Sequence, residues 1–436
     1  MANTYLTRTQ TAGNRRKGTF SAWVKRSALA YNYLMSWNST TSGTSYGDWI
    51  RFNGDRLDII KYTGSVVYRV QTNRLFRDTS AWYHIVVAYD SEQGTTSNRI
   101  KVYVNGVQET SFETSTYPSQ NYDFEFNNNS IVACVGKNYN TEAAFDGSMS
   151  YIHWVDGTQY DASAFGETDT TTGEWEAKTS PSVTYGNNGF FILKDGNSVT
   201  DQSGRGNNFT VGGGTLTNLK DNPDNVFATW NSLFRRGTIT PTFSNGNLTS
   251  NFTGGAQQFA LTSLGASSGK YYAEMKWVSS HGNGACITGI LDMAFSGTAD
   301  PNGAVTNAFG YFASGTKHIS GSSSSYGASY GAGDIIGIAI DCDNSKLYFS
   351  KNGVYQNSGV PTSGSTGTGA IPIISGVTYG IYGSEYDGRI ASLNTGNGYF
   401  GTTAISSEGS NASGIGKFEY DVPTGYTALS TKGLNS

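Results

Sequence analysis

Asn-Gly and Asp-Gly dipeptides constrain the fold of this 436-residue chain more than any other feature of its sequence. Both central residues of a type I′ turn need positive φ, which Asn, Asp and Gly tolerate, so these dipeptides favour two-residue β-hairpins. Twelve of them are spread along the chain, beginning at Asn53, Asn105, Asp146, Asp156, Asn188, Asp195, Asn245, Asn283, Asn302, Asn352, Asp387 and Asn397. The spacing predicts many short strands joined by tight turns.

Hydrophobic alternation with a period of two accompanies several of these turns. It is clearest at 100–104 and 346–350, directly before Asn105-Gly106 and Asn352-Gly353, where it predicts half-buried strands. Further strand candidates are Phe20–Lys25, Trp82–Tyr89, Ile131–Gly136, Met149–Val155, Gly189–Lys194, Tyr271–Val278, Ile335–Asp341 and Tyr379–Tyr382. No convincing segment of ten residues or more follows the helical period of 3.6. The fold class we expect is all-β, with two antiparallel β-sandwich (jelly-roll) domains in tandem.

The expected domain boundary lies where strand patterning is weakest, between about Gly212 and Phe243. A chain of this length suits two domains. We expect a first sandwich over residues 1–237, ending in an extension or linker at about 212–237, and a second over 238–436 with a C-terminal tail.

Charge and hydropathy limit the partners and the location that we expect. The net charge of −4 and one short basic cluster, Arg15-Arg16-Lys17, argue against nucleic-acid binding. No apolar run is long enough to enter a bilayer, and the N-terminus lacks the apolar core of a signal peptide. Three widely spaced cysteines without a CxxC pair predict buried free thiols: Cys134, Cys286 and Cys342.

Catalytic motifs occur only in unsuitable surroundings. Two GxSxG matches, Gly43–Gly47 and Gly327–Gly331, are not followed by the helix that a nucleophile elbow requires. Glycoside hydrolysis needs paired carboxylates, and the nearest approaches, Glu167–Asp169 and Glu385–Asp387, fall in segments that resemble loops. We therefore expect no catalytic residues and no enzyme activity.

Metal ligands are not arranged in a known pattern either. The four histidines are scattered, and we expect His84 and His153 to pack inside strands. Asp48, Asp55 and Asp58 are clustered, and Asp195 with Asp201 brackets another turn, but neither set has EF-hand spacing. No cofactor and no metal site is predicted, with calcium left open.

A dense set of aromatic residues suggests ligand binding. Aromatic faces beside Asn or Asp can bind sugars, although aromatic residues also fill sandwich cores, so both interpretations stay open. Two tyrosines spaced along the Ser/Gly tract Ser320 to Gly333 add to this set. The candidate ligand-binding residues are Tyr31, Tyr33, Trp37, Tyr46, Asp48, Trp49, Tyr326 and Tyr330.

Four segments of the first half resemble the laminin-G-like, concanavalin-A-type jelly rolls. They read GTFSAWVKR at 18–26, WYHIVVAYD at 82–90, RIKVYVNG at 99–106 and FDGSM at 145–149. The resemblance covers roughly residues 3 to 212 and implies that the Trp-His strand pairs with the Tyr-Val-Asn-Gly hairpin.

The second half resembles SPRY domains. The segments are GKYYAEM at 269–275, GDIIGIAID at 333–341 and KLYFSKNG at 346–353, and the resemblance covers about residues 240 to 400. It implies a bent sandwich that binds partner proteins through surface loops and has no catalytic residues.

The combination resembles structural proteins of tailed, marine-type bacteriophages. The similar segments include YLTRT at 5–9, AGNRRK at 12–17, DQSGRGNNFT at 201–210 and DNPDNVFAT at 221–229. The resemblance implies a virion protein made in the bacterial cytoplasm, a compact fibre, spike, knob or decoration subunit. Its partners would be other virion proteins and a host-surface polysaccharide.

Three functions stay open on this basis. The first is glycan binding by such a virion subunit, and the second is a purely structural role in the head or tail. The third and least favoured is a glycan-cleaving tailspike or glucanase. Because virion appendages are symmetric, we expect a homo-oligomer, with a trimer as the working guess.

Overall fold

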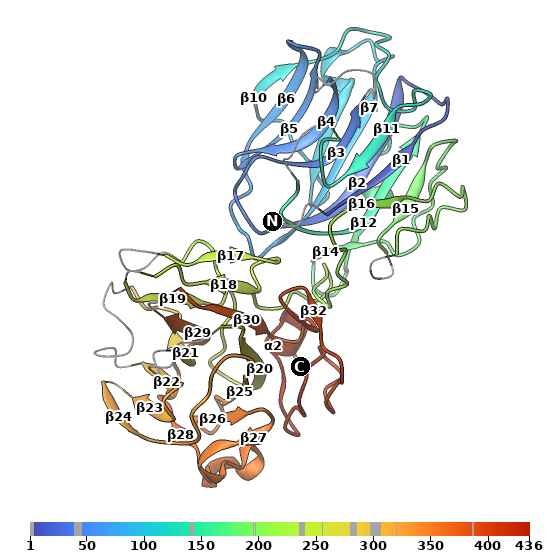
Figure 1. The fold of residues 1–436 in the computed structure, drawn as a ribbon. Coiled ribbons are helices and arrows are strands. Elements are labelled where there is room, and N and C mark those ends of the chain that lie inside the picture. Colours follow the sequence, from blue (N-terminus) through green and yellow to red (C-terminus); the bar gives the residue numbers. More distant parts are fainter. Residues whose placement is uncertain are drawn as a thin grey trace. The chain divides into compact units, whose positions relative to one another are not determined.

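A computed structural model describes residues 4–38, 46–139, 144–194, 196, 198–234, 240–254, 256–279, 286–296, 307–319, 321–385 and 388–436. The chain divides into two compact units, Met1–Asn218 and Leu219–Ser436. Each is built mainly of antiparallel sheets, so the all-β prediction is confirmed (Figure 1). The described helices are single turns or little more: η1 (Thr96–Asn98), η2 (Ala162–Ala164), η3 (Gln356–Ser358), η4 (Pro361–Thr366) and α2 (Thr431–Leu434). None of them combines the length and hydropathy that a membrane span requires.

The first unit contains two large sheets. The eight-stranded sheet has the order β10 (Phe112–Thr116), β6 (Val66–Leu75), β5 (Arg56–Tyr62), β4 (Gly47–Asn53), β3 (Asn32–Asn38), β11 (Val132–Val135), β1 (Tyr5–Thr9) and β16 (Thr210–Gly213). The six-stranded sheet has the order β15 (Phe190–Ile192), β12 (Gly147–Asp156), β2 (Lys17–Arg26), β7 (Trp82–Asp90), β8 (Ile100–Val104) and β9 (Val107–Gln108). A small separate pair joins β13 (Gly166–Thr168) to β14 (Trp175–Ala177).

The core of the first unit is made of the inward-facing residues of both large sheets. Trp37 of β3 and Trp154 of β12 are fully buried, and their ring centroids lie 4.7 Å apart. Phe126, from the segment before β11, packs against both rings. This interdigitation of two alternating faces is what defines a β-sandwich.

The second unit is also built on two large sheets. In the nine-stranded sheet the order is β17 (Thr242–Ser244), β18 (Thr249–Asn251), β30 (Ile390–Asn394), β20 (Lys270–Trp277), β25 (Ile335–Asp341), β26 (Lys346–Lys351) and β27 (Val354–Tyr355), with β28 (Ile371–Pro372) on β26 and β33 (Thr427–Ala428) on β20. In the six-stranded sheet it is β19 (Gln258–Leu261), β29 (Tyr379–Glu385), β21 (Ile287–Asp292), β22 (Ala308–Phe312), β23 (Thr316–Ile319) and β24 (Ser322–Ser325). The short strands β31 (Tyr399–Phe400) and β32 (Thr403–Ala404) form a separate pair.

The division between the units lies earlier in the chain than the sequence indicated. We expected it near residue 238, but the segment from Leu219 onward belongs to the second unit. Phe227 and Trp230 are buried in the hydrophobic clusters of that unit, and they form bridges with Ser430 and Thr262 respectively. The part of the weakly patterned segment that contains Phe227 and Trp230 is thus packed into the second unit.

Two of the predicted hairpins have the expected turn. Asn105-Gly106 links β8 to β9 and Asn352-Gly353 links β26 to β27, with positive φ at all four residues. All three cysteines are buried, as predicted, and none of them forms a disulfide.

Candidate functional site

The outer face of the six-stranded sheet in the first unit is covered by the chain itself. Residues of the segment around β13 and β14 pack on it, against side chains of the sheet such as Val86 and Phe191. His84 of β7 lies between Trp23 of β2 and Trp175 of β14, with ring centroids 5.0 and 5.9 Å away. This face therefore forms a second hydrophobic cluster with the segment that covers it, separate from the main core of the first unit.

His84 has a purely structural environment, in line with the packing role expected from the sequence. Its Nδ1 accepts a hydrogen bond from Trp175 Nε1 at 3.0 Å, because an indole nitrogen can only donate. The ring proton therefore sits on Nε2, which donates to Ser21 Oγ at 2.8 Å. Burial lowers the pKa of His84 to about 3, so the ring stays neutral.

The outer face of the eight-stranded sheet instead carries a cluster of arginine and aromatic side chains. We call it the arginine–aromatic face and define it as Tyr31, Tyr33, Trp49, Arg51, Asp58, Ile60, Tyr62 and Arg69. Strand register places its members together. Arg51 of β4 lies opposite both Tyr33 of β3 and Asp58 of β5, and Ile60 of β5 lies opposite Arg69 of β6.

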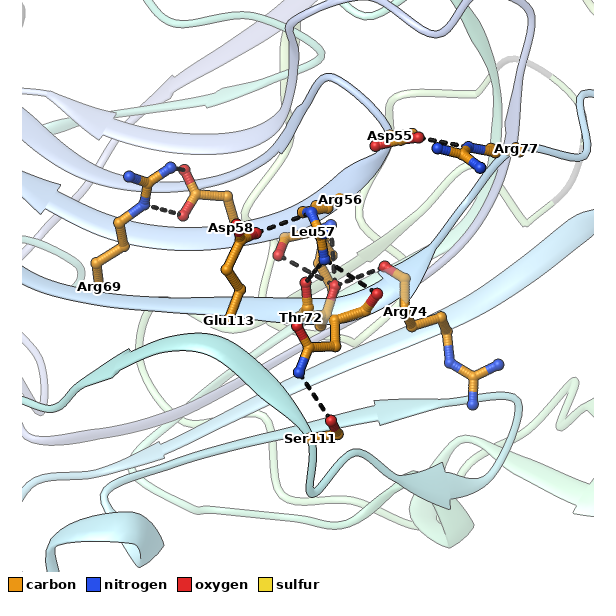
Figure 2. A network of polar contacts seen from close by, with 11 residues as sticks. Asp55, Arg56, Leu57, Asp58, Arg69, Thr72, Arg74, Arg77, Ser111 and Glu113 are labelled. Atoms are coloured by element: carbon orange, nitrogen blue, oxygen red, sulfur yellow. Dashed lines mark hydrogen bonds and ion pairs between the residues drawn. The ribbon is translucent and has the colours of Figure 1, made fainter.

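Two arginines share one carboxylate at the centre of this face. Arg51 Nε and Nη2 each lie 2.9 Å from Asp58 Oδ2. Arg69 donates from Nε to Asp58 Oδ1 at 2.8 Å and from Nη2 to Oδ2 at 3.2 Å. Figure 2 shows this two-pronged contact between Arg69 and Asp58. Burial lowers the pKa of Arg51 below its ordinary value, and the nearby Asp58 offsets only part of this effect.

Aromatic rings surround the Arg51 guanidinium. Its central carbon lies 4.4 Å from the centre of the Tyr31 ring and 5.3 Å from that of Trp49, within cation–π range. Trp49 also stacks on Tyr62, with centroids 5.9 Å apart. Most of this cluster is closed to solvent, but Tyr31 keeps 41% of its surface exposed. Tyr46, just before β4, is 36% exposed.

Trp37 and Asp48, two of the candidate ligand-binding residues, point to the opposite side of the sheet, into the core. Trp37 is fully buried, and Asp48 accepts a hydrogen bond from Tyr68 Oη at 2.9 Å. Burial raises the pKa of Asp48. A β-bulge between Tyr33 and Met35 reverses the alternation along β3, so Tyr33 and Trp37 face opposite ways despite their even spacing.

Tyr326 and Tyr330, the candidates from the Ser/Gly tract, lie in the core of the second unit. The Tyr326 hydroxyl accepts from the Phe349 amide at 3.2 Å, and the Tyr330 hydroxyl donates to the Tyr311 carbonyl at 2.7 Å. Part of the tract forms strand β24. The candidate binding set therefore narrows to Tyr31, Tyr33, Tyr46 and Trp49, for which sugar contact stays a prediction.

Arg51, Asp58 and Arg69 were not among the residues that the sequence singled out for binding. The Asn53-Gly54 dipeptide would not have paired the first two, because a two-residue turn centred on it places Arg51 opposite Arg56. In the structure the turn is Gly54-Asp55 and Asn53 lies opposite Arg56, which brings Arg51 opposite Asp58. Arg69 joins them through the register of the next strand, which is interrupted by irregularities.

The other motifs are dispersed. Glu385 is not in a loop as expected but is buried at the end of β29, and Glu167 lies in β13. Strand β25, not a helix, follows Gly327–Gly331, while Ser45, Asp195 and Asp387 lie outside the described residues. Within the described ranges, no three His, Cys, Asp or Glu side chains are grouped so as to hold a metal ion.

Comparison with known families gives two matches. Residues 2–159 match the concanavalin A-like lectin/glucanases superfamily, and residues 270–380 match the SPRY domain. A concanavalin A-like domain and a SPRY domain are thus both present, as the sequence resemblances indicated. No curated protein sequence matches the chain.

Among solved structures, similar chains include a putative carbohydrate binding protein from Bacteroides ovatus (16% identity, TM-score 0.35), covering 50% of this chain and 59% of that one. Others are a heptameric SAP-like pentraxin from Limulus polyphemus (15%, 0.33, covering 50% and 91%) and the SPRY domain of human HERC1 (18%, 0.30, covering 35% and 91%).

Proposed function

We propose that this chain, with its concanavalin A-like and SPRY domains, is a non-catalytic binding protein whose first unit binds saccharides at the arginine–aromatic face. The observation that carries the proposal is the Tyr31 ring. Tyr31 is 41% exposed, and the Arg51 guanidinium lies over its ring, 4.4 Å from the ring centre. A fixed aromatic ring offers the C–H face of a sugar a large contact at low entropic cost.

Polar groups beside the ring suit sugar hydroxyls. Arg69, whose side chain is 24% exposed, is held by Asp58 and thus presents its remaining donors in a fixed direction. Pre-organised donors beside an aromatic surface are typical of small-ligand sites.

A glycan array tests this proposal with the full chain and two single variants. Tyr31→Ala removes the exposed ring. It is expected to lower the affinity for any glycan that binds by about tenfold, in line with the loss of one aromatic contact. Val107→Ala is the control, since Val107 is 63% exposed and lies on the other sheet. This variant is expected to bind glycans with the affinity of the wild type. Absence of binding to every bacterial polysaccharide at millimolar concentration would sink the proposal.

We further propose that the protein is a virion component, a compact fibre, spike, knob or decoration subunit of a tailed bacteriophage. The support is the sequence resemblance of the segments 5–9, 12–17, 201–210 and 221–229 to phage structural proteins. Antibodies raised against the chain are expected to label tailed particles in electron micrographs. Light scattering is expected to give a mass three times that of the chain, and a monomer would contradict the proposed trimer.

The alternative is a purely structural subunit that contacts only other virion proteins. Antibody labelling of tailed particles, together with no binding to any glycan on the array, would favour this alternative. Turnover of a polysaccharide by the purified chain would contradict both and point to a tailspike or glucanase.

A further inference from the structure

We infer that the arginine–aromatic face selects saccharides that carry a carboxylate. The inference rests on the proposed saccharide-binding function and specifies its ligand class. It is carried by the imbalance of charge around Asp58 and by the position of that imbalance beside the exposed Tyr31 ring.

The charges on the arginine–aromatic face do not cancel, whereas Lys61 of β5 pairs with two carboxylates, Asp48 and Glu125, and does not belong to that face. Arg51 and Arg69 share the single carboxylate of Asp58, whereas three other arginines each pair with a carboxylate of their own. Those pairs are Arg56–Glu113, Arg74–Glu109 and Arg77–Asp55. On the arginine–aromatic face, two guanidinium groups thus share one carboxylate, and one positive charge remains there. Figure 2 shows the Arg56, Arg69 and Arg77 contacts along these strands.

The excess charge is available at Arg69. Asp58 is fully buried, and both of its oxygens already accept hydrogen bonds from the two arginines. Arg69 uses Nε and Nη2 for this contact, and its Nη1 donates no hydrogen bond to any described residue. Arg69 thus keeps N–H donors that no described residue accepts, on a side chain that is 24% exposed.

A carboxylate is the group that these donors suit best. Hydrogen bonds between guanidinium and carboxylate are charge-assisted and about twice as strong as neutral ones. Arg51 contacts both the Tyr31 ring and Asp58, so the ring and the Arg69 donors belong to one connected cluster. A uronic or sialic acid has both complementary parts, a C–H face for the ring and a carboxylate for the guanidinium.

Calorimetric titration of the full chain tests the inference with oligogalacturonate, sulfated dextran and neutral dextran as probes. Oligogalacturonate is expected to bind most tightly, and its affinity is expected to fall as salt is raised, because salt screens exposed charges. Arg69→Gln is expected to weaken oligogalacturonate binding by about tenfold, the effect of losing a hydrogen bond to a charged group. Arg77→Gln is the matched control, because Arg77 is exposed and lies outside the cluster. This variant is expected to bind oligogalacturonate with the affinity of the wild type.

The outcomes separate this inference from the proposed function. Equal affinity for dextran and oligogalacturonate, or tighter binding of sulfated dextran, overturns the carboxylate preference and leaves saccharide binding standing. Unchanged oligogalacturonate binding by Arg69→Gln does the same. Binding of none of the three probes overturns the inference, and only an empty glycan array overturns the proposed function as well. Should Arg69→Gln fail to fold, Arg69→Lys decides: it keeps the charge but loses the planar fork, so a several-fold loss is expected and unchanged affinity contradicts the inference.

Discussion

Glu274 is a buried carboxylate of the second unit that joins β20 to the C-terminal segment. Its Oε1 accepts hydrogen bonds from Tyr272 Oη and the Tyr420 amide, at 3.3 and 2.8 Å. Its Oε2 accepts from Asn394 Nδ2 and the Glu419 amide, at 3.1 and 3.0 Å. Burial outweighs these four bonds and raises the pKa of Glu274 to about 7. The side chain therefore holds its proton more tightly in the folded than in the unfolded chain.

Glu274 should thus make folding depend on pH. A folded-state pKa above the unfolded value of 4.5 stabilises the fold fully below that value, and the stabilisation is lost as pH rises through about 7. Chemical denaturation of the wild type and Glu274→Gln across this range measures the effect. The difference in unfolding free energy between them is expected to change by roughly 3 kcal/mol. Glu408→Gln, at a half-exposed surface carboxylate, is the control; a constant difference between wild type and Glu274→Gln would refute the prediction.

At the scale of elements, two hairpins of the first unit contain the same Asn-Gly dipeptide in different surroundings. Gly106, between β8 and β9, has a φ of +81°, and a Cβ there would lie 2.7 Å from Trp175 Cε3. Gly54, between β4 and β5, has a φ of +64°, but a Cβ there would have no neighbour within 4 Å. Both positions require glycine for the backbone, and Gly106 also requires it for packing.

Alanine substitution separates these two requirements. Gly54→Ala is expected to cost about 1 kcal/mol, the price of a left-handed backbone for a residue with a Cβ. Gly106→Ala is expected to cost roughly 1–3 kcal/mol more, because its Cβ would push the Trp175 ring away from His84. Urea unfolding of the two variants measures the difference. Equal losses would mean that the β13–β14 pair moves aside freely.

At the scale of the molecule, the segment after Leu219 decides where the second unit begins. Phe227 and Trp230 are buried in its core, so a fragment that starts at the predicted boundary lacks both side chains. Fragment 219–436 is expected to unfold cooperatively, and fragment 238–436 is expected to be less stable by roughly 5 kcal/mol or more, as losing two core aromatic side chains implies. Thermal unfolding followed by circular dichroism compares them. Similar midpoints for the two fragments would return the boundary to residue 238.

Much of the secondary structure could be predicted because it is local. Alternation and turn dipeptides act within a few residues, and strands such as β2, β7, β20 and β25 lie where these patterns placed them. The two family resemblances likewise depend on short segments that the sequence contains in full. The Asn-Gly signal alone was less reliable: Asn188-Gly189, for instance, has no positive φ, and Asn188 is buried against Asp156 instead.

What the sequence by itself determined was the all-β class, the two kinds of sandwich and the aromatic cluster from which the site was chosen. What only the tertiary structure decided was which side of the sheet each member of that cluster faces. One bulge between Tyr33 and Met35 of β3 sends Trp37 into the core and leaves Tyr33 beside Arg51, whereas on β4 ordinary alternation puts Asp48 on the core side and Trp49 beside Arg51. Side chains on a strand alternate with a period of two, so a single extra residue exchanges the faces of all that follow. The pairing of Arg69 with Asp58 and the packing of Trp230 depend in the same way on contacts between distant segments, which no local pattern encodes.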